Sequence, residues 1–334
     1  MITKTHIRKR VFIVAEIGNN HEGNTDRCIK LVKKAIRCGV DAIKLQTFIP
    51  KLYYSKEEKK RISRLNKFSL SQEGLIRVKE FCDSQNIIFF STPFDVESAI
   101  FLNSIQNVFK ISSGDNNFHE LIDQIASFNK PIFISTGLAD KKQIISVHER
   151  IIRKWKKTSD EKFLAFLHCV SCYPVSSSQA NLRAIKTLRK VFKDLLIGYS
   201  DHCEGIQASI VAVALGAKII EKHFTDDKNF SSFRDHKLSA DPKEMTQLVR
   251  MIRKTEVLMG NGKLDPSVDE INTMNSMRRS LAAKKFLPKG SKISSDDLVW
   301  LRPGNGIIEK KKIIGKVLTK DLEEGKKFSL KDIN

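Results

Sequence analysis

Two lysines and a glutamate stand in apolar runs of the sequence, where charged side chains are unusual. Lys44 lies in AIKLQTF, Lys110 lies in VFKISSG, and Glu16 lies near the end of VFIVAEIG. Burying a lysine in a strand costs free energy unless the amine is paired or binds an anion. A structural salt bridge would explain one such lysine, but two lysines and a glutamate that converge on one site favour an anionic substrate.

Two histidines end neighbouring apolar runs and are candidate metal ligands. His202 closes LLIGYSDH, and His223 lies near the end of KIIEKHFT. If these runs are adjacent strands, which lie ~4.8 Å apart, both imidazoles can meet one ion. With two nitrogen ligands and the rest from water and substrate, Mn²⁺ fits best, while Co²⁺ or Mg²⁺ would also suit such a site.

Hydroxyl groups follow several of the same runs. Ser113 precedes Gly114, Ser135 begins Ser-Thr-Gly, and Ser200 precedes Asp201. Hydroxyls and free backbone N–H groups beside lysines are typical of phosphate-binding sites.

Eight apolar runs alternate with amphipathic helical stretches, and these elements would have to position the reactive residues. Eight such units in about 250 residues predict a (β/α)8 TIM barrel, with the active site at the carboxyl ends of its strands. A doubly wound open sheet is the alternative, but no G-x-G-x-x-G follows the first run. The stretch after the second run is the longest and is expected to hold an irregular loop. The runs begin at Val11, Ala42, Ile87, Val108, Pro131, Phe163, Leu195 and Lys218.

The character of the chain changes after the eighth unit. We predict a catalytic barrel over 1–258, a linker over 259–280 and a small β-rich domain over 281–334. In the last part, LPKGSKISSDDL from Leu287 is repeated as LEEGKKFSLKDI from Leu322. Two short copies suggest a pseudo-symmetric domain in which each copy supplies one turn and one strand.

Composition excludes several classes of protein. The chain has 334 residues, of which 41% are hydrophobic and 29% charged, as in soluble globular proteins. The net charge of +21 comes without a nucleic-acid-binding motif, so no nucleic-acid partner is expected. No apolar run approaches the ~20 residues that span a bilayer, and the basic N-terminus makes a poor signal peptide. We therefore expect a cytoplasmic protein, with Cys169 and Cys172 of CVSC reduced and structural.

Together the motifs resemble those of the bacterial sialic acid (nonulosonate) synthases. The resemblance covers essentially the whole chain and extends to the antifreeze-like (SAF) domain that this family carries after its barrel. The motifs are AEIGNNHEG from Ala15, IKLQT from Ile43, FSTPF from Phe90, FKISSG from Phe109, STG from Ser135, YSDH from Tyr199, EKHFT from Glu221, DHK from Asp235 and RPGNG from Arg302.

The resemblance implies that phosphoenolpyruvate condenses with the open-chain form of N-acetylmannosamine or a related N-acyl amino sugar. It implies a divalent metal on His202 and His223, and a homodimer in which each SAF domain caps the partner's barrel. Glu16, expected to be ionised, would stabilise the cationic centre or accept a proton from water. Phosphoenolpyruvate would bind to Lys44, Lys110, Ser113, Ser135 and Ser200, and the sugar to Gln46, Asp115, Tyr173, Asp235 and, from the partner's SAF domain, Arg302.

The sequence departs from the sialic acid pattern at three places on the sugar side. Asp115 stands where a glutamate is usual, Ser171 replaces an asparagine of some members, and SSFRDH from Ser231 lacks a Pro-Gly-Pro before Asp235. These departures leave open which sugar is used, N-acetylmannosamine or a 2,4-diacetamido deoxy sugar.

Three alternatives remain at this stage. One is a Schiff-base aldolase that uses Lys44 or Lys110 as a nucleophile. Another is a related barrel synthase of lipopolysaccharide or aromatic biosynthesis, against which the C-terminal domain argues. The third is a non-catalytic sugar-binding relative.

Overall fold

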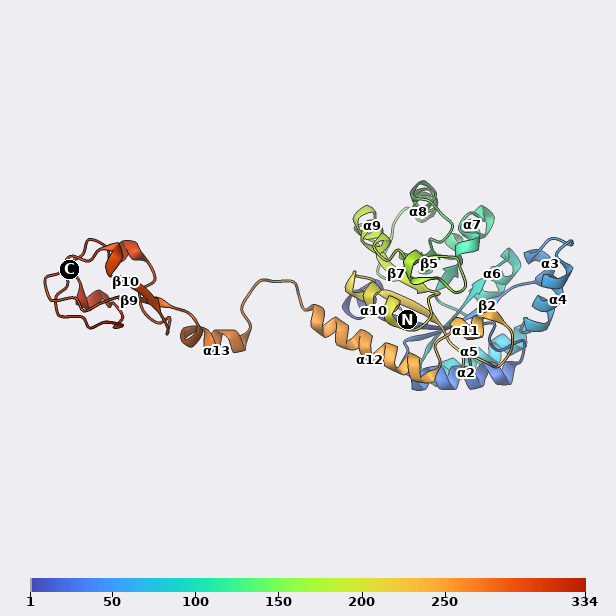
Figure 1. Ribbon diagram of the computed structural model, residues 1–334. Coiled ribbons are helices and arrows are strands. Elements are labelled where there is room, and N and C mark those ends of the chain that lie inside the picture. Colours follow the sequence, from blue (N-terminus) through green and yellow to red (C-terminus); the bar gives the residue numbers. More distant parts are fainter. Residues whose placement is uncertain (1) are drawn as a thin grey trace. The chain divides into compact units, whose positions relative to one another are not determined.

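The computed structural model describes residues 2–334, which fall into two compact units that divide between Gly260 and Asn261 (Figure 1). Each of the eight apolar runs forms a strand of the first unit. These strands are β1 (Phe12–Gly18), β2 (Ala42–Thr47), β3 (Ile88–Pro93), β4 (Phe109–Ile111), β5 (Ile132–Ser135), β6 (Leu164–Cys169), β7 (Leu196–Asp201) and β8 (Ile219–His223).

The strands are parallel and follow the order β3-β2-β1-β8-β7-β6-β5-β4. β3 and β4 lie against each other and complete the circle. There the buried side chain of Gln106 bonds both backbone groups of Ser91, at 2.7 and 3.2 Å. The predicted barrel is confirmed.

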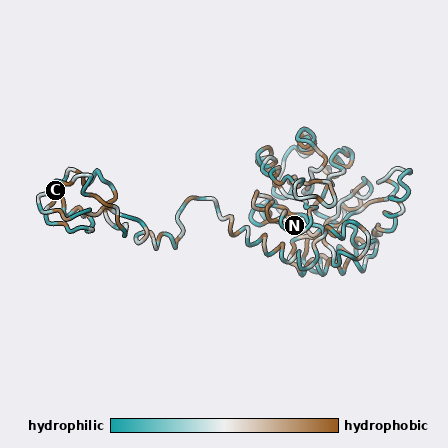
Figure 2. Tube along the Cα trace, in the orientation of Figure 1, coloured by the Kyte–Doolittle hydropathy of each residue, from teal (hydrophilic) through white to brown (hydrophobic). Residues whose placement is uncertain are grey.

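Helices follow the strands because their apolar residues recur at helical spacing. In α2 the buried residues Cys28, Leu31, Val32 and Ala35 form one face, and Asn24 caps the helix by accepting from the N–H of Arg27. Figure 2 shows helices that alternate between hydrophobic and hydrophilic residues, as one-sided burial requires. The helices of the first unit are α1 (Lys4–Lys9), α2 (Thr25–Arg37), α3 (Pro50–Tyr53), α4 (Lys59–Phe68), α5 (Gln72–Ser84), α6 (Val96–Asn103), α7 (His119–Ser127), α8 (Lys141–Trp155), α9 (Ala184–Val191), α10 (Gln207–Ala214), α11 (Arg234–Leu238) and α12 (Pro242–Met259).

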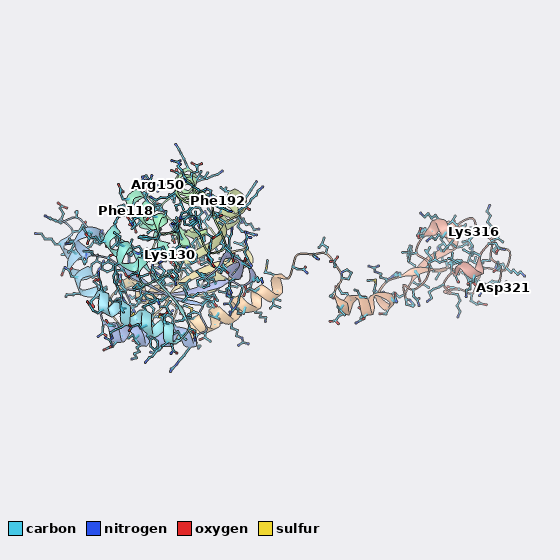
Figure 3. All side chains as sticks on the ribbon, turned by 180° about the vertical axis from the view of Figure 1, so that it is seen from behind. Phe118, Lys130, Arg150, Phe192, Lys316 and Asp321 are labelled. Carbon is cyan, nitrogen blue, oxygen red and sulfur yellow. The ribbon has the colours of Figure 1, made fainter. Side chains whose placement is uncertain are left out.

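Outer helices are also joined by polar contacts. Arg150 on α8 makes two bonds to the carboxylate of Asp123 on α7, at 2.6 and 2.7 Å (Figure 3). Lys130 donates to the carbonyls of Asn103 and Gln106, at 2.6 and 2.7 Å, and so ties the end of α6 to the chain before β5.

Alternate residues of each strand point into the barrel, and the character of this interior changes along the axis. At the amino end it is apolar: Phe133 packs against Phe12, Phe90 and Phe163, with ring centroids 6.0–6.3 Å apart. Ile7 of α1 joins the same buried cluster. Further along the strands, the interior positions become charged or polar. A packed floor therefore supports the chemistry at the carboxyl end.

The stretch between β2 and β3 differs from the predicted irregular loop. It forms two extra helices, α3 and α4, before α5. Leu65 of α4 is buried with Phe48 and Phe94, and Tyr53 packs against this cluster. These apolar anchors make helices favourable where only a loop was expected.

The second unit contains α13 (Val268–Met277) and an antiparallel pair, β9 (Ser280–Ala283) and β10 (Leu298–Leu301). α13 lies within the predicted linker, where Ser267 and Glu270 form a capping box.

The two repeat copies occupy equivalent places in the second unit. Leu287 and Leu322, the first residues of the copies, pair with each other through two backbone bonds of 2.8 and 2.9 Å. Gly290 and Gly325 both adopt positive φ, 85° and 76°, which explains why each copy has a glycine at its turn. Ile293 and Phe328 are both buried in the core of this unit. Each copy thus forms a turn followed by an extended segment around a common core.

None of the helices in residues 2–334 is long and apolar enough to cross a membrane.

Candidate active site

A cavity of about 350 Å³ opens at the carboxyl ends of the barrel strands. It gathers most of the residues selected from the sequence, which come from six strands and from the connections that follow strands. The predicted residues that line it are Glu16, Lys44, Gln46, Lys110, Ser113, Ser135, Ser171, Tyr173, Ser200, His202, His223 and Asp235.

The charged residues meet because register and alternation place them on one interior layer. In the β-ladders Glu16 lies opposite Lys44 on one side and His223 on the other. The amine of Lys44 is 3.0 Å from Glu16 Oε2 and 3.5 Å from Glu221 Oε1. Lys110 reaches the same Glu221 oxygen at 3.5 Å. Two lysines and two carboxylates therefore form one buried cluster.

Burial and neighbouring charges shift the pKa values of the two carboxylates of this cluster in opposite directions. Burial raises the pKa of Glu16 to about 7, with repulsion from Glu221 adding to the rise and Lys44 opposing it. Burial also acts to raise the pKa of Glu221, but Lys110 and Lys44 outweigh it and lower that pKa to about 2. Glu16 is therefore poised to exchange a proton near neutral pH, while Glu221 stays ionised. The expectation that Glu16 is simply ionised was incomplete, because it took no account of Glu221.

The pKa values of the two lysines are also shifted in opposite directions. Burial acts to lower the pKa of Lys44, but Glu16 and Glu221 reverse this and raise it. Lys110 pairs with Glu221 but is also repelled by Lys44, so burial prevails and its pKa is lowered.

The two histidines fit a partly open metal site. Their ring centroids are 5.5 Å apart. Burial lowers the pKa of His202 to about 4, and burial and His202 lower the pKa of His223, so both rings are neutral. His202 Nδ1 lies 2.9 Å from the carbonyl of Val170, which must accept its proton, and Nε2 is left with the lone pair. Nδ1 of His223 is buried without a partner among the described residues.

No group of three or more His, Cys, Asp or Glu side chains in residues 2–334 is arranged to hold a metal ion. The donor set is thus two imidazoles, and water and substrate would have to complete it.

The hydroxyls beside the lysines include one that has no partner. Ser200 donates to Glu221 at 2.9 Å, and Ser171 donates to Ser113 at 2.7 Å. Ser135 Oγ is buried and makes no hydrogen bond within the described chain. A buried hydroxyl left without a partner costs free energy unless a ligand or water satisfies it.

The opposite wall of the cavity is built from aromatic and charged side chains on helices and connections. The guanidinium of Arg234 lies 4.4 Å from the centre of the Tyr173 ring, and its Nε is 3.3 Å from Asp235 Oδ1. Asp235 is buried, which raises its pKa. Phe233 packs edge-on against Phe68 at 5.0 Å.

Two predicted site residues lie elsewhere. Asp115 is half-buried at the end of a short turn and accepts a bond from Ser112. Burial raises its pKa to about 6, and it does not line the cavity. Arg302 is exposed and belongs to the second unit, so its part in the site stays a prediction.

Several residues of the site were missed in the sequence. Glu221 is the most important, and alternation identifies it: it stands two residues before His223, so both side chains face the interior. The same rule turns Lys222 outward, where its amine pairs with Asp201 at 3.2 Å. On the wall formed by Tyr173, Phe233, Arg234 and Asp235 no periodic signal exists, because the residues lie outside the strands. The missed residues that line the cavity include Thr92, Tyr53, Arg64, Phe68, Phe233 and Arg234.

Comparison with known proteins gives two family matches. The NeuB family matches residues 31–264, and the SAF domain matches residues 278–333. The chain is 37% identical to the N,N'-diacetyllegionaminic acid synthase of Campylobacter jejuni, over 95% of this chain and 98% of that protein. It is 35% identical to a pseudaminic acid synthase of the same species, over 95% of both chains.

A solved structure extends the likeness to three dimensions. The N-acetylneuraminic acid synthetase of Leptospira borgpetersenii, crystallised with citrate, aligns with a TM-score of 0.75 and 33% identity, covering 81% of this chain and 93% of that one. The resemblance found in the motifs is thereby confirmed. The chain belongs to the NeuB family and carries a SAF domain after its barrel.

Proposed function

We propose that the protein is a transferase that condenses phosphoenolpyruvate with an open-chain N-acyl amino sugar and water, and releases a nonulosonic acid and phosphate. The observation that carries this proposal is the buried pair Lys44 and Lys110 beside Ser135, whose hydroxyl has no partner in the described chain. Such a buried set of two amines and a free hydroxyl suits a small, multiply charged anion. Phosphoenolpyruvate has that charge and size.

In the proposed reaction the chain's own groups hold the anion and move one proton. Lys44, Lys110 and the hydroxyls of Ser113, Ser135 and Ser200 bind the carboxylate and phosphate. C3 of phosphoenolpyruvate forms a bond to the sugar's aldehyde carbon, and positive charge develops at C2. Water adds to C2 and gives a proton to Glu16, whose raised pKa suits this transfer. Glu16 then passes this proton to the alkoxide that the aldehyde oxygen of the sugar has become. At the tetrahedral carbon the bond to the bridging oxygen breaks, the new hydroxyl gives its proton to the leaving phosphate, and C2 becomes a ketone.

A divalent ion on His202 and His223, Mn²⁺ in our proposal, would polarise the aldehyde oxygen of the sugar as a Lewis acid. Gln46, which donates to Glu16 at 3.0 Å, would keep the carboxylate oriented. On the other wall Ser171, Tyr173 and Asp235 would bind the sugar. We further propose a cytoplasmic homodimer in which Arg302 of each SAF domain completes the partner's site.

A direct test measures phosphate released from phosphoenolpyruvate in the presence of N-acetylmannosamine and a 2,4-diacetamido deoxy sugar. Release that depends on one of these sugars supports the proposal, and no release with any acceptor and Mn²⁺ contradicts it. Phosphoenolpyruvate with ¹⁸O in the C–O–P bridge tests the bond that breaks. The label should leave with phosphate, whereas label kept in the sugar acid would require P–O cleavage.

The lowered pKa of Lys110 favours one second candidate, a Schiff-base aldolase. Reduction with borohydride in the presence of pyruvate would trap a covalent adduct on Lys110 in that case. Our proposal predicts no adduct.

A further inference from the structure

The chain after β8 brings sugar-side residues into the cavity. Residues 226–239 include Phe233, Arg234 and Asp235, all of which line it. Only α11, five residues long, is regular within this segment. Its backbone is therefore held mainly by contacts with other parts of the barrel, and these contacts decide where Asp235 lies.

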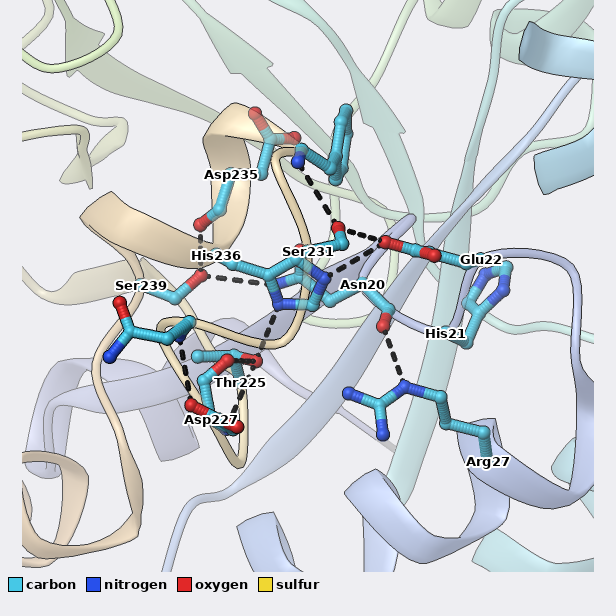
Figure 4. A network of polar contacts seen from close by, with 12 residues as sticks. Asn20, His21, Glu22, Arg27, Thr225, Asp227, Ser231, Asp235, His236 and Ser239 are labelled. Carbon is cyan, nitrogen blue, oxygen red and sulfur yellow. Dashed lines mark hydrogen bonds and ion pairs between the residues drawn. The ribbon is translucent and has the colours of Figure 1, made fainter.

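One anchor of this segment is Glu22, in the connection after β1. Its Oε1 accepts a bond from the hydroxyl of Ser231 and lies 3.3 Å from Nε2 of His236 (Figure 4). The His236 ring is fully buried, and its Nδ1 lies 2.7 Å from the hydroxyl of Thr225. Ser231 in turn accepts from the N–H of Phe233 at 3.1 Å. Glu22 thus grips the segment on both sides of Phe233–Asp235.

Asn20 of the same connection and Arg27 of α2 hold the ends of the segment. Arg27 pairs with Asp226 at 2.9 Å, and its guanidinium lies 3.3 Å from the centre of the Phe230 ring. The amide of Asn20 donates to Ser239 Oγ at 3.0 Å, and that hydroxyl donates to the carbonyl of Asp235 at 2.5 Å. Asn20 and Glu22 of the sequence NNHEG, together with Arg27 one turn into the following helix, therefore contact the segment from Asp226 to Ser239.

Glu22 is held in this network by hydrogen bonds rather than by an ion pair. Burial lowers the pKa of His236, although Glu22 opposes the shift, so the ring is neutral and its Nε2–H donates to the carboxylate. The other groups that face His236 are the rings of Phe230 and Phe233, with Arg27 and Asp226 further away. Glu22 acts here as an acceptor of two hydrogen bonds, and an amide oxygen of the same shape could replace it.

We propose that Glu22 is a positioning residue for the acceptor sugar: through Ser231 and His236 it holds the segment that presents Arg234 and Asp235, and it touches neither substrate. The inference rests on the proposed function, since it assigns these two side chains to the sugar. It separates the role of the connection after β1 into two parts, with Glu16 in the chemistry and Glu22 in sugar binding.

Steady-state kinetics of Glu22→Ala, Glu22→Gln and Ser232→Ala test this. Loss of a hydrogen bond to a charged group is worth about 10-fold or more in affinity, so Glu22→Ala should raise KM for the sugar by about 10-fold. KM for phosphoenolpyruvate should stay within about twofold, because Lys44 and Lys110 lie on strands. Glu22→Gln should restore most of the loss. Ser232 is exposed, with no hydrogen bond inside the described chain, and serves as the matched control.

Equal increases in both KM values, or a fall in kcat alone, would overturn the proposal, because they indicate a general structural defect. No change in any constant would overturn it as well. If Glu22→Ala does not fold, Ser231→Ala removes one of the two bonds and should raise the sugar KM alone, by a smaller factor.

Hydrogen exchange separates this inference from the proposed reaction. Amides of 228–238 should exchange faster in Glu22→Ala than in the wild type, while amides of β2 and β8 should not change. Faster exchange in 228–238 supports the role of Glu22 as an anchor even if the wild-type protein releases no phosphate with any sugar. Absence of phosphate release would contradict only the proposed reaction. Unchanged exchange in 228–238 contradicts the anchor whatever the enzyme does.

Discussion

The two walls of the cavity are built in different ways. On the anion side (the wall that we propose binds phosphoenolpyruvate), Lys44, Lys110 and Glu221 lie within strands and are 3%, 2% and 5% exposed. On the sugar side (the wall that we propose binds the acceptor), Tyr53 and Arg234 lie on short helices, and the Arg234 side chain is 64% exposed. Backbone hydrogen bonds between the barrel strands hold the residues of the anion side in place. The residues of the sugar side are held by contacts of side chains. A scaffold of this kind can keep one reaction and change its acceptor, and similar proteins are indeed named for different sugar acids.

The strongest test concerns the two histidines at the carboxyl ends of β7 and β8. The double substitution His202→Ala with His223→Ala should reduce activity to background with every sugar, since no group of three or more His, Cys, Asp or Glu side chains in residues 2–334 could hold the ion in their place. A chelator should have the same effect on the wild type, and Mn²⁺ should reverse it. Activity and metal content are measured together. Full activity of the double variant would exclude a catalytic metal on these two histidines.

Glu16→Gln should have the next largest effect. It keeps the shape of the side chain and removes the proton acceptor, so kcat should fall by roughly 10²–10⁴-fold with folding intact. The loss should be the same for every accepted sugar, because Glu16 belongs to the strand wall. A kcat within a few-fold of the wild type would exclude Glu16 from the reaction. A loss that depends on the sugar would mean that Glu16 also contributes to sugar binding.

The strand wall was also the part most accessible to prediction. Apolar runs identify all eight strands, and the cost of burying a lysine marks Lys44 and Lys110 as unusual from the sequence alone. Glu221 was overlooked because a glutamate near the end of a run can be read as a boundary. Because side chains alternate along a strand, Glu221, two residues before His223, also faces the interior of the barrel. Alternation is thus a rule for selecting site residues as well as for assigning strands.

The sugar wall could not be predicted in the same way. Tyr53 and Arg64 lie where an irregular loop was expected, and Phe233 and Arg234 lie in a segment with little regular structure. Their places depend on long-range contacts, such as those of Glu22 and Arg27, which no local period encodes. Asp235 was found only because the motif around it resembles that of the family, whereas Tyr173 was marked by its place after the sixth apolar run.

Arg302 offers a test of whether the sugar wall extends beyond the barrel. It lies in LRPGNG, directly after β10, and is exposed. If it bonds the N-acyl carbonyl of the sugar, Arg302→Ala should lower kcat/KM by roughly 10- to 150-fold, the value of a charged hydrogen bond. The loss should appear in the constants for the sugar. Loss of affinity for phosphoenolpyruvate alone would contradict this assignment.

Mixing two defective subunits tests the shared site. Assayed at sugar concentrations below KM, Arg302→Ala should keep about a tenth of wild-type activity or less, and Glu16→Ala should keep far less. Exchange of subunits should raise the activity of the mixture to about a quarter of the wild-type value. Random pairing makes half of the dimers hybrid, and each hybrid has one intact site of two. No recovery after proven exchange would mean that each SAF domain does not serve the partner's barrel.

The smallest expected effect comes from Glu221→Gln, which changes the balance of the strand wall without removing a reacting group. Glu16 must lose its proton to act as a base, so activity in the wild type should rise with pH through about 7, the pKa that burial and Glu221 give it.

The substitution Glu221→Gln removes the repulsion between the two carboxylates and leaves Lys44 to Glu16 alone, so the pKa of Glu16 falls. The rising limb of kcat/KM should then move to lower pH by about one unit, while activity at pH 8 should stay within about 10-fold of the wild type. Glu22→Gln, on the sugar side, should leave the limb in place. A limb that does not move in folded Glu221→Gln would show that the two carboxylates act independently.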